Sequence, residues 1–308
     1  MELTGRASRA GVLLAVVGVL GFSFKAVLVK LAYAAHPVDP VTLLTLRMLY
    51  SAPMFAALAW HVERAPGRAP LARRDVLAIA WLGFVGYYLS SFLDFAGLFY
   101  IKASLERLIL FLYPTIVVML SAVFLRQRIG RRTFAALVLS YAGIALVFAH
   151  DLVTTPQSAD VALGAALVFG SAFLYAAYLV GAGPVIARLG SRRFIAWAML
   201  VSTAFVLVQF ALLRPLEALD VPPAIHGLVL AMAVVSTFVP VWCVAEALKR
   251  VDANTVALVG CLGPVFTIAF GHALLGERIH ALQLAGAAAV LSGVLLVTWR
   301  KRDPAPQV

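Results

Sequence analysis

The sequence predicts an all-α polytopic membrane protein with ten transmembrane helices, arranged as two inverted five-helix repeats. Three observations predict this fold: an apolar composition, ten apolar runs, and an internal repeat flanked by unevenly distributed basic loops. Of the 308 residues, 63% are hydrophobic and only 13% are charged, and the mean hydropathy is +0.98. This balance is incompatible with a water-soluble domain, and the sequence lacks the short alternating segments of a membrane β-barrel.

The apolar runs have about the length that a helix needs to cross the hydrocarbon core of a bilayer. Short connections rich in proline or charge separate them, for example at 36–40, 64–68, 152–160 and 219–223. The runs cover residues 10–33, 40–61, 76–99, 104–125, 132–149, 161–182, 194–213, 224–247, 254–275 and 281–299. The first run is long and is followed by further spans, so we interpret it as a retained helix and not as a signal peptide.

The internal repeat places residues 103–147 over residues 253–297 without a gap, at a spacing of 150. Only 11 of the 45 positions are identical, but Pro114 falls on Pro264 and Gly143 falls on Gly293. A repeat of five spans is odd, so the second copy must enter the membrane upside down. The predicted domains are therefore a first repeat at 10–149 and an inverted second repeat at 161–299.

The basic residues indicate the orientation of the chain. Eighteen Lys and Arg residues fall in the loops of one side and three (Lys102, Arg214 and Arg278) fall on the other. By the positive-inside rule, both termini are expected in the cytoplasm of a cell that carries the protein in its plasma membrane. The net charge of +11 thus reports topology and does not indicate a nucleic-acid partner.

The sequence gives little support for a function other than transport. The two cysteines, Cys243 and Cys261, lie inside predicted spans and are interpreted as small buried residues. No metal-ligand spacing and no phosphate-binding loop of the type GxxxxGK[ST] occur, so we expect no metal, no cofactor and no primary transport by this chain. An intramembrane enzyme would need clustered acids or a nucleophile with its base, whereas the acids here are scattered.

Residues 251–299 resemble the EamA-type domain of the drug/metabolite transporter superfamily. The matching positions are Pro264-Val265, Gly276-Glu277-Arg278-Ile279, Gly286 and Gly293-Val294. The first copy shows Tyr113-Pro114, Arg128-Ile129 and Gly143, with Gln127 at the position of Glu277, and Gly21-Phe22-Ser23-Phe24 and Arg47 also look like that family. The resemblance covers nearly the whole chain. It implies a ten-helix carrier that moves a small metabolite.

Charged side chains inside the first repeat are candidates for the transport site, because each costs about 2.5–3.5 kcal/mol at the bilayer centre. We expect Lys25 and Arg47 to line the path and meet an anionic group, while Asp94 and Glu106 hold them or carry a proton. The alternative is that Lys25–Asp94 and Arg47–Glu106 are structural ion pairs. Lys30 and Arg107 are expected to extend to the outer interface. The excess of positive charge favours a substrate with a carboxylate or phosphate.

Helical spacing adds neighbours to these charges. Tyr87 and Ser91 share a face with Asp94, and Tyr113 shares one with Glu106. The predicted translocation path consists of Lys25, Arg47, Tyr87, Ser91, Asp94, Glu106 and Tyr113. The repeat-related Pro114 and Pro264 are expected to bend their helices, either as packing kinks or as hinges for alternating access. Spans 5 and 10 are rich in Gly and Ala, which predicts close packing or a homodimer contact.

The predicted function is that of a secondary transporter, with a small-molecule substrate and the lipid bilayer as its partners. It could export amino acids or other small anionic or zwitterionic metabolites by alternating access. The alternative is a non-transporting or channel-like membrane protein in which the buried charges are structural. Composition and spacing do not distinguish import from export, or proton coupling from exchange.

Overall fold

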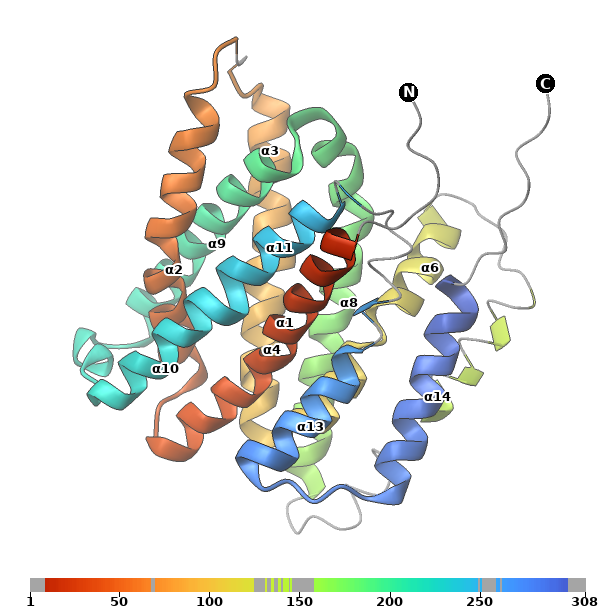
Figure 1. The fold of residues 1–308 in the computed structure, drawn as a ribbon. Helices are drawn as coiled ribbons and strands as arrows, with labels where there is room; N and C mark the ends of the chain where they lie inside the picture. The colour runs from red at the N-terminus through yellow and green to blue at the C-terminus, as the bar shows by residue number, and fades with distance from the viewer. Residues whose placement is uncertain are drawn as a thin grey trace, which may run out of the picture.

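A computed structural model of the chain describes residues 9–67, 70–124, 158–248, 250, 259–260 and 262–298, with scattered positions between 131 and 145. Within these ranges the chain forms helices and turns and contains no strand (Figure 1), which confirms the predicted all-helical class. The helices are α1 (Arg9–Ala35), α2 (Pro40–Glu63), α3 (Arg73–Leu82), α4 (Ser90–Tyr100), α5 (Ala103–Leu110), α6 (Tyr113–Phe124), α8 (Ser158–Leu189), α9 (Ser191–Leu213), α10 (Pro223–Ala233), α11 (Val239–Leu248), α13 (Gly263–Leu275) and α14 (Ala281–Thr298).

Six helical stretches are long and apolar enough to cross a membrane, counted within the described ranges. They are Arg9–Ala35, Pro40–Glu63, Arg73–Tyr100, Ala159–Ile186, Ser191–Leu213 and Pro223–Val244, and they coincide with six of the predicted spans. Two shorter apolar helices lie at Gly263–Leu275 and Ala281–Gly293. The chain is therefore a polytopic membrane protein. The predicted span 132–149 and the start of span 254–275 fall largely outside the described residues, so the count of ten stays a prediction.

Local sequence explains where the helices begin. The Asp39 side chain accepts hydrogen bonds from the backbone nitrogens of Val41 (3.0 Å) and Thr42 (3.3 Å), and Pro40 occupies the first helical position of α2. A side-chain cap followed by proline is a strong signal for the start of a helix. The cap accepts hydrogen bonds from the first backbone N–H groups, which have no acceptor within the helix, and proline has no N–H group to leave unpaired. Pro223 likewise occupies the first position of α10, after the predicted connection at 219–223, but its N-cap residue Pro222 makes no side-chain hydrogen bond.

Two π-helical segments interrupt the long helices. Segment η1 (Gly83–Leu89) joins α3 to α4, and segment η3 (Val234–Phe238) joins α10 to α11. In η3 the hydroxyls of Ser236 and Thr237 both donate to the Met232 carbonyl, each at 2.9 Å. Such wide turns add a residue to the helix and rotate the face that follows them. A short 3₁₀ turn, η2 (Leu216–Leu219), lies between α9 and α10.

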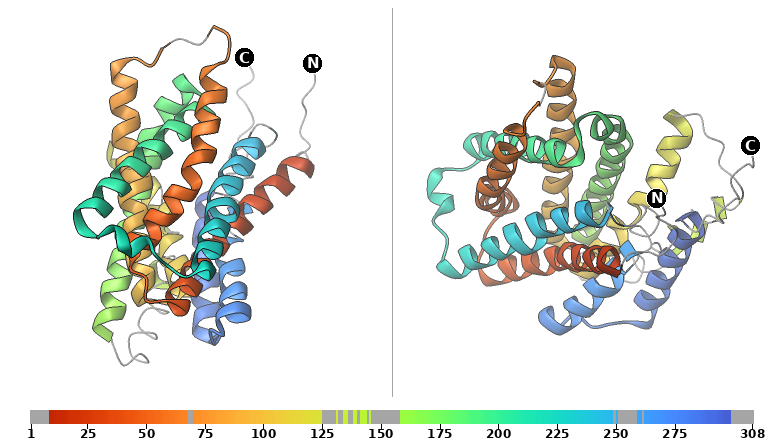
Figure 2. Two further views of the ribbon diagram at one scale, coloured as in Figure 1. Left: turned by 90° about the vertical axis from the view of Figure 1, so that its left-hand side faces the viewer. Right: turned by 45° about the horizontal axis from the view of Figure 1, so that its top comes forward.

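The helices of the two halves lie beside one another. Helix α8 runs opposite to α1, and α9 runs opposite to α2 (Figure 1). The views of Figure 2 show α1 alongside α11. Large apolar side chains such as Leu13, Trp81 and Leu212 are 64%, 65% and 78% exposed, as the lipid-facing surface of a membrane protein requires.

Glycine permits the close contact of α1 with η3 and α11. A Cβ atom on Gly18 would lie 2.7 Å from Val244 Cγ2, and one on Gly21 would lie 2.5 Å from the Val235 carbonyl oxygen. In the Gly-rich spans 5 and 10, a Cβ on Gly143 would likewise lie 2.8 Å from the Gly286 carbonyl oxygen. Small residues in membrane helices therefore serve close packing within this chain.

Salt bridges tie α2 to α9 at both of their ends. Arg193 Nε lies 2.6 Å from Glu63 Oε1 at one end, and Arg214 Nε lies 3.1 Å from Asp39 Oδ1 at the other. Because α2 belongs to the first half of the chain and α9 to the second, these pairs hold the halves together outside the apolar interior.

We expect Gly21→Ala to lower the free energy of unfolding by about 1–3 kcal/mol, because the added methyl group meets backbone that cannot rotate away. Gly227→Ala is the matched control, since a Cβ there meets nothing within 4 Å. Thermal unfolding of the purified protein in detergent measures both. Equal melting temperatures for the two variants would contradict this account of the contact of α1 with η3 and α11.

Candidate functional site

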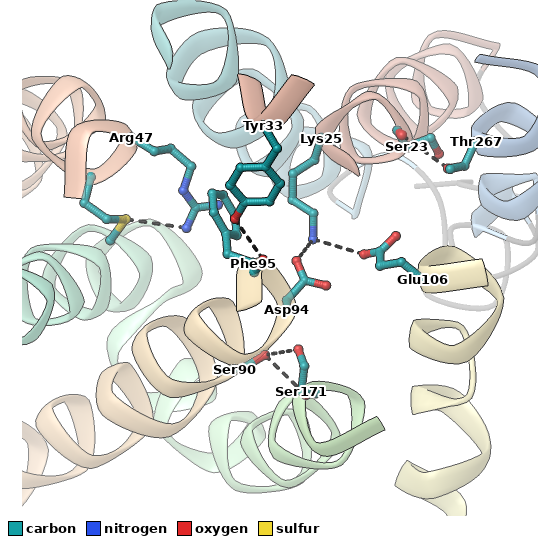
Figure 3. Close-up of polar contacts among 11 residues, drawn as sticks. Ser23, Lys25, Tyr33, Arg47, Ser90, Asp94, Phe95, Glu106, Ser171 and Thr267 are labelled. Carbon is teal, nitrogen blue, oxygen red and sulfur yellow. Dashed lines mark hydrogen bonds and ion pairs between the residues drawn. The ribbon is translucent and has the colours of Figure 1, made fainter. Parts of the chain in front are cut away.

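A buried lysine with two carboxylates lies at the centre of the candidate site (Figure 3). Lys25 of α1 forms an ion pair with Asp94 of α4, and its Nζ lies 3.6 Å from Glu106 Oε1 of α5. The three side chains are 15%, 3% and 0% exposed. The structure therefore brings together three predicted site residues from three different helices.

This cluster has more acceptors than donors. Asp94 Oδ1 and both carboxylate oxygens of Glu106 are buried without a hydrogen-bond partner in the structure. One ammonium group faces two carboxylates. The free-energy cost of removing these charges from water is offset only where each charge finds an ion-pair or hydrogen-bond partner. Glu106 is thus the least satisfied charged side chain of the cluster, and it can accept a proton or a cationic group.

Arg47 occupies the other side of the Lys25–Asp94 pair (Figure 3). Its guanidinium carbon lies 4.8 Å from the centroid of the Phe95 ring, and Nη2 lies 3.6 Å from Met48 Sδ. The residue is 5% exposed and its Nε has no hydrogen-bond partner. The alternative expectation of an Arg47–Glu106 ion pair is wrong, because the Lys25–Asp94 pair lies between the two side chains.

The second half of the chain reaches the site through α13. The Ser23 hydroxyl of α1 donates to the Gly263 carbonyl at 3.1 Å, and the Thr267 hydroxyl donates to the Ser23 carbonyl at 3.2 Å (Figure 3). These bonds fix α13 against α1 two residues from Lys25. Sequence analysis missed both hydroxyl groups, because single Ser and Thr residues in apolar spans carry little signal on their own.

The two tyrosines of the predicted lining, Tyr87 and Tyr113, turn towards α8. The Tyr87 hydroxyl lies 2.9 Å from the Tyr178 hydroxyl, and the Tyr113 ring centroid lies 5.2 Å from that of Tyr175. Ser90, not Ser91, makes the hydrogen bond in this region, and Ser91 is only partly buried. Tyr87 does not share the expected face with Asp94, because it belongs to η1, whose π-helical turns change the phase. Ser91 and Asp94 both lie in the regular helix α4, so their shared face stays a prediction.

Two more charged side chains of the first half, Lys30 and Arg107, are partly buried. Lys30 Nζ donates to the Leu98 carbonyl at 3.1 Å, and Arg107 Nε is buried without a partner. The Arg107 guanidinium packs against Gly263, where a Cβ would lie 2.8 Å from Nη2. Both side chains are partly exposed, so their extension to the outer interface stays a prediction. The Tyr33 hydroxyl, which sequence analysis missed, donates to the Phe95 carbonyl at 2.8 Å.

The two repeat-related prolines each stand in the first turn of a helix. Pro114 is the second residue of α6, which follows a break after α5, and Pro264 is the second residue of α13. Backbone N–H groups in the first turn of a helix have no acceptor within the helix. Proline has no N–H group, so neither helix loses a hydrogen bond. The predicted bends are thus interruptions between helices. Within the described residues, no group of three His, Cys, Asp or Glu residues could hold a metal ion.

Comparison with known proteins divides the chain into the same two halves. The EamA-like transporter family matches residues 9–149 and residues 162–299. The uncharacterized transporter YcbK of Bacillus subtilis is 27% identical over 96% of this chain and 95% of its own length. The pseudopaline exporter CntI of Pseudomonas aeruginosa is 27% identical over 94% of each chain.

A solved crystal structure with 19% sequence identity superposes with a TM-score of 0.63, covering 95% of this chain and 97% of that chain. At this identity the likeness shows the fold alone. The family match covers most of the chain, so the chain belongs to the EamA-like transporter family and is a membrane transporter. Bacterial transporter relatives imply the plasma membrane, and members of such families are generally not enzymes.

We expect Lys25→Met and Asp94→Asn to be coupled in a double-mutant cycle by about 0.5–3 kcal/mol. Each single change leaves a buried charge without its partner, whereas the double change removes both charges. Lys25→Met combined with Asp75→Asn is the control, because Asp75 pairs with Arg188 across α3 and α8 at 2.7 Å. Additive effects for the Lys25 and Asp94 changes, measured by unfolding in detergent, would contradict the pairing.

Proposed function

We propose that this chain is a secondary transporter that exports a small zwitterionic metabolite by alternating access. The observation that carries the proposal is the buried charge cluster, in which Arg47 and Glu106 each keep polar atoms without partners. Charged groups this deep in a membrane transporter are costly, and in such proteins they mark substrate or ion pathways. The relative named as an exporter of pseudopaline supports the direction of transport.

The two halves are proposed to be inverted five-helix repeats, at 10–149 and 161–299. Corresponding elements recur near the 150-residue spacing: α3 begins at Arg73 and α10 at Pro223, and α6 begins at Tyr113 and α13 at Gly263. The π-helical segments recur too, at Gly83–Leu89 and Val234–Phe238. The opposite directions of α1 and α8 support the inversion (Figure 1). The basic loops place both termini in the cytoplasm under this proposal.

The substrate class follows from which charges are left unmatched. Lys25 is paired with Asp94, so the excess of positive charge counted in the sequence does not describe the site. Arg47 and Glu106 lie on opposite sides of that pair, and each keeps buried polar atoms without a hydrogen-bond partner (Figure 3). Arg107 Nε also has no partner, but its guanidinium packs against Gly263 of α13. A molecule with an anionic group for the Arg47 guanidinium and a cationic group for the Glu106 carboxylate complements both.

The remaining residues of the predicted path take supporting roles in this proposal. Tyr87 and Tyr113 contact α8 through Tyr178 and Tyr175, and Ser91 lies one turn before Asp94. They would form the wall of the path where the two halves meet. Pro114 and Pro264 begin helices at interruptions, which is where hinge motion is absorbed most easily. Homodimer formation stays a prediction.

The alternative is a channel-like or non-transporting protein whose buried charges only lock the helices. The Lys25–Asp94 pair agrees with that alternative. The atoms of Arg47 and Glu106 that lack a hydrogen-bond partner do not, because a structural lock gains nothing from burying polar atoms without hydrogen bonds. A carrier shows saturable exchange, whereas a channel shows graded conductance, and flux measured in proteoliposomes separates the two.

We expect zwitterions to raise the melting temperature of the purified protein more than their single-charge analogues do. The test set consists of amino acids, each accompanied by its decarboxylated amine and its deaminated acid. A ligand at about 100 times its Kd stabilises the folded state by roughly 2.7 kcal/mol. Arg47→Met should abolish the advantage conferred by the carboxylate, and Glu106→Gln should abolish the advantage conferred by the amine.

Arg214→Met is the matched control, because Arg214 is 40% exposed and pairs with Asp39 at the end of the bundle. This variant should keep the ligand response of the parent. If ligand responses persist unchanged in Arg47→Met and Glu106→Gln, the two charges are structural and the proposed site is wrong.

A further inference from the structure

A loop of the second half closes over the start of α5, the helix that carries Glu106. Glu277 Oε1 accepts a hydrogen bond from the Ala103 backbone nitrogen at 2.9 Å, and Oε2 accepts one from the Ser104 nitrogen at 3.3 Å. The first amide groups of a helix have no partner within the helix, and the helix dipole favours negative charge there. The Glu277 carboxylate therefore caps α5.

The shape of the loop delivers this carboxylate to α5. Helix α13 ends at Gly276, whose φ of 67° is left-handed, and the Glu277 amide then donates to the Gly271 carbonyl at 3.1 Å. His272 Nδ1 lies 2.9 Å from the Glu277 carbonyl oxygen. A Cβ on Gly271 would lie only 2.9 Å from Glu277 Oε2. Two glycines thus leave room for the side chain to fold back beside its own helix.

The cap comes from far along the chain because the local sequence supplies none. The residue before α5 is Lys102, and its side chain makes no capping hydrogen bond. A typical cap is a Ser, Thr, Asp or Asn immediately before the helix. Here the partner lies 174 residues later, in the other half. The N-terminal end of α5 is therefore held only while the two halves stay together at this end of the bundle.

The capped turn is also the turn that enters the charge cluster. Ser104 is 1% exposed and its hydroxyl has no partner, and Glu106 follows two residues later with 0% exposure. Helix α13, which precedes Glu277, is bound to α1 through Ser23 and Thr267. Helix α13 and its loop consequently contact both α1, which carries Lys25, and α5, which carries Glu106.

We propose that Glu277 is a positioning residue that latches this end of the transport path, and that release of its two hydrogen bonds opens the path to Glu106. This inference rests on the proposed function, because a latch has a role only in a carrier that alternates between two openings. The carboxylate keeps α5 and α13 together in the closed state. Its loss shifts the population towards the state that is open on the side of loop 276–280.

Side-specific labelling of a single cysteine tests the latch. In a background with Cys243→Ala and Cys261→Ala, Ser104→Cys reports access to the turn between Glu277 and Glu106. We expect Glu277→Ala to raise the rate of reaction with a membrane-impermeant maleimide about tenfold or more, from the face that carries loop 276–280, since two charge-assisted hydrogen bonds are lost. Labelling of Arg278→Cys, at an exposed position, identifies that face. Glu277→Gln keeps one acceptor oxygen, so its labelling rate should lie between those of the parent and Glu277→Ala.

Arg214→Ala is the matched control, because it breaks the Asp39–Arg214 pair between the halves and touches neither α5 nor α13. It should leave Ser104→Cys labelling unchanged. Labelling of Glu277→Ala at the parent rate, or a rise from both faces together, would overturn the latch and leave only a stabilising cap. Labelling requires no flux, so a parent protein that shows the latch but no saturable transport would refute the proposed function separately.

Discussion

The candidate site depends on one interaction, in which the Lys25 ammonium group lies between two carboxylates inside an apolar helix bundle; the lysine side chain is 15% exposed. Such a group is tolerated in a membrane only with a partner, so Lys25 requires α4 to present Asp94 at the same depth. Glu106 adds a second negative charge that the lysine does not neutralise. This imbalance distinguishes the cluster from a closed structural ion pair, and it gives the site a group that can exchange its partner.

Interruptions in the helices make this convergence possible. Segment η1 rotates one part of the third span relative to the other, so that Tyr87 contacts α8 while Asp94 contacts Lys25. The break between α5 and α6 separates Glu106 from Tyr113, which packs against Tyr175 instead. Uninterrupted helices would have kept these residues on common faces. The irregular turns therefore divide one predicted lining into a charged cluster and a separate tyrosine contact.

The halves are interdependent although all the buried charges of the cluster come from the first. Helix α1, which carries Lys25, packs its glycines against η3 and α11 and bonds to α13. Helix α5, which carries Glu106, takes its cap from Glu277. Any motion of one half against the other consequently acts on the position of both charged side chains, which is the physical requirement for a site that alternates between two openings.

The sequence by itself determined the class of the protein, the placement of most helices and the connections between them, because apolar run length, proline and charge act locally. It also identified Lys25, Asp94 and Glu106, since buried charge is rare enough to be noticed in a single chain. Only the tertiary structure decided that Arg47 lies over Phe95, that Tyr87 meets Tyr178 and that Glu277 caps α5. These contacts join segments 48 to 174 residues apart, and helical periodicity cannot report the π-helical phase change or the partner across the bundle.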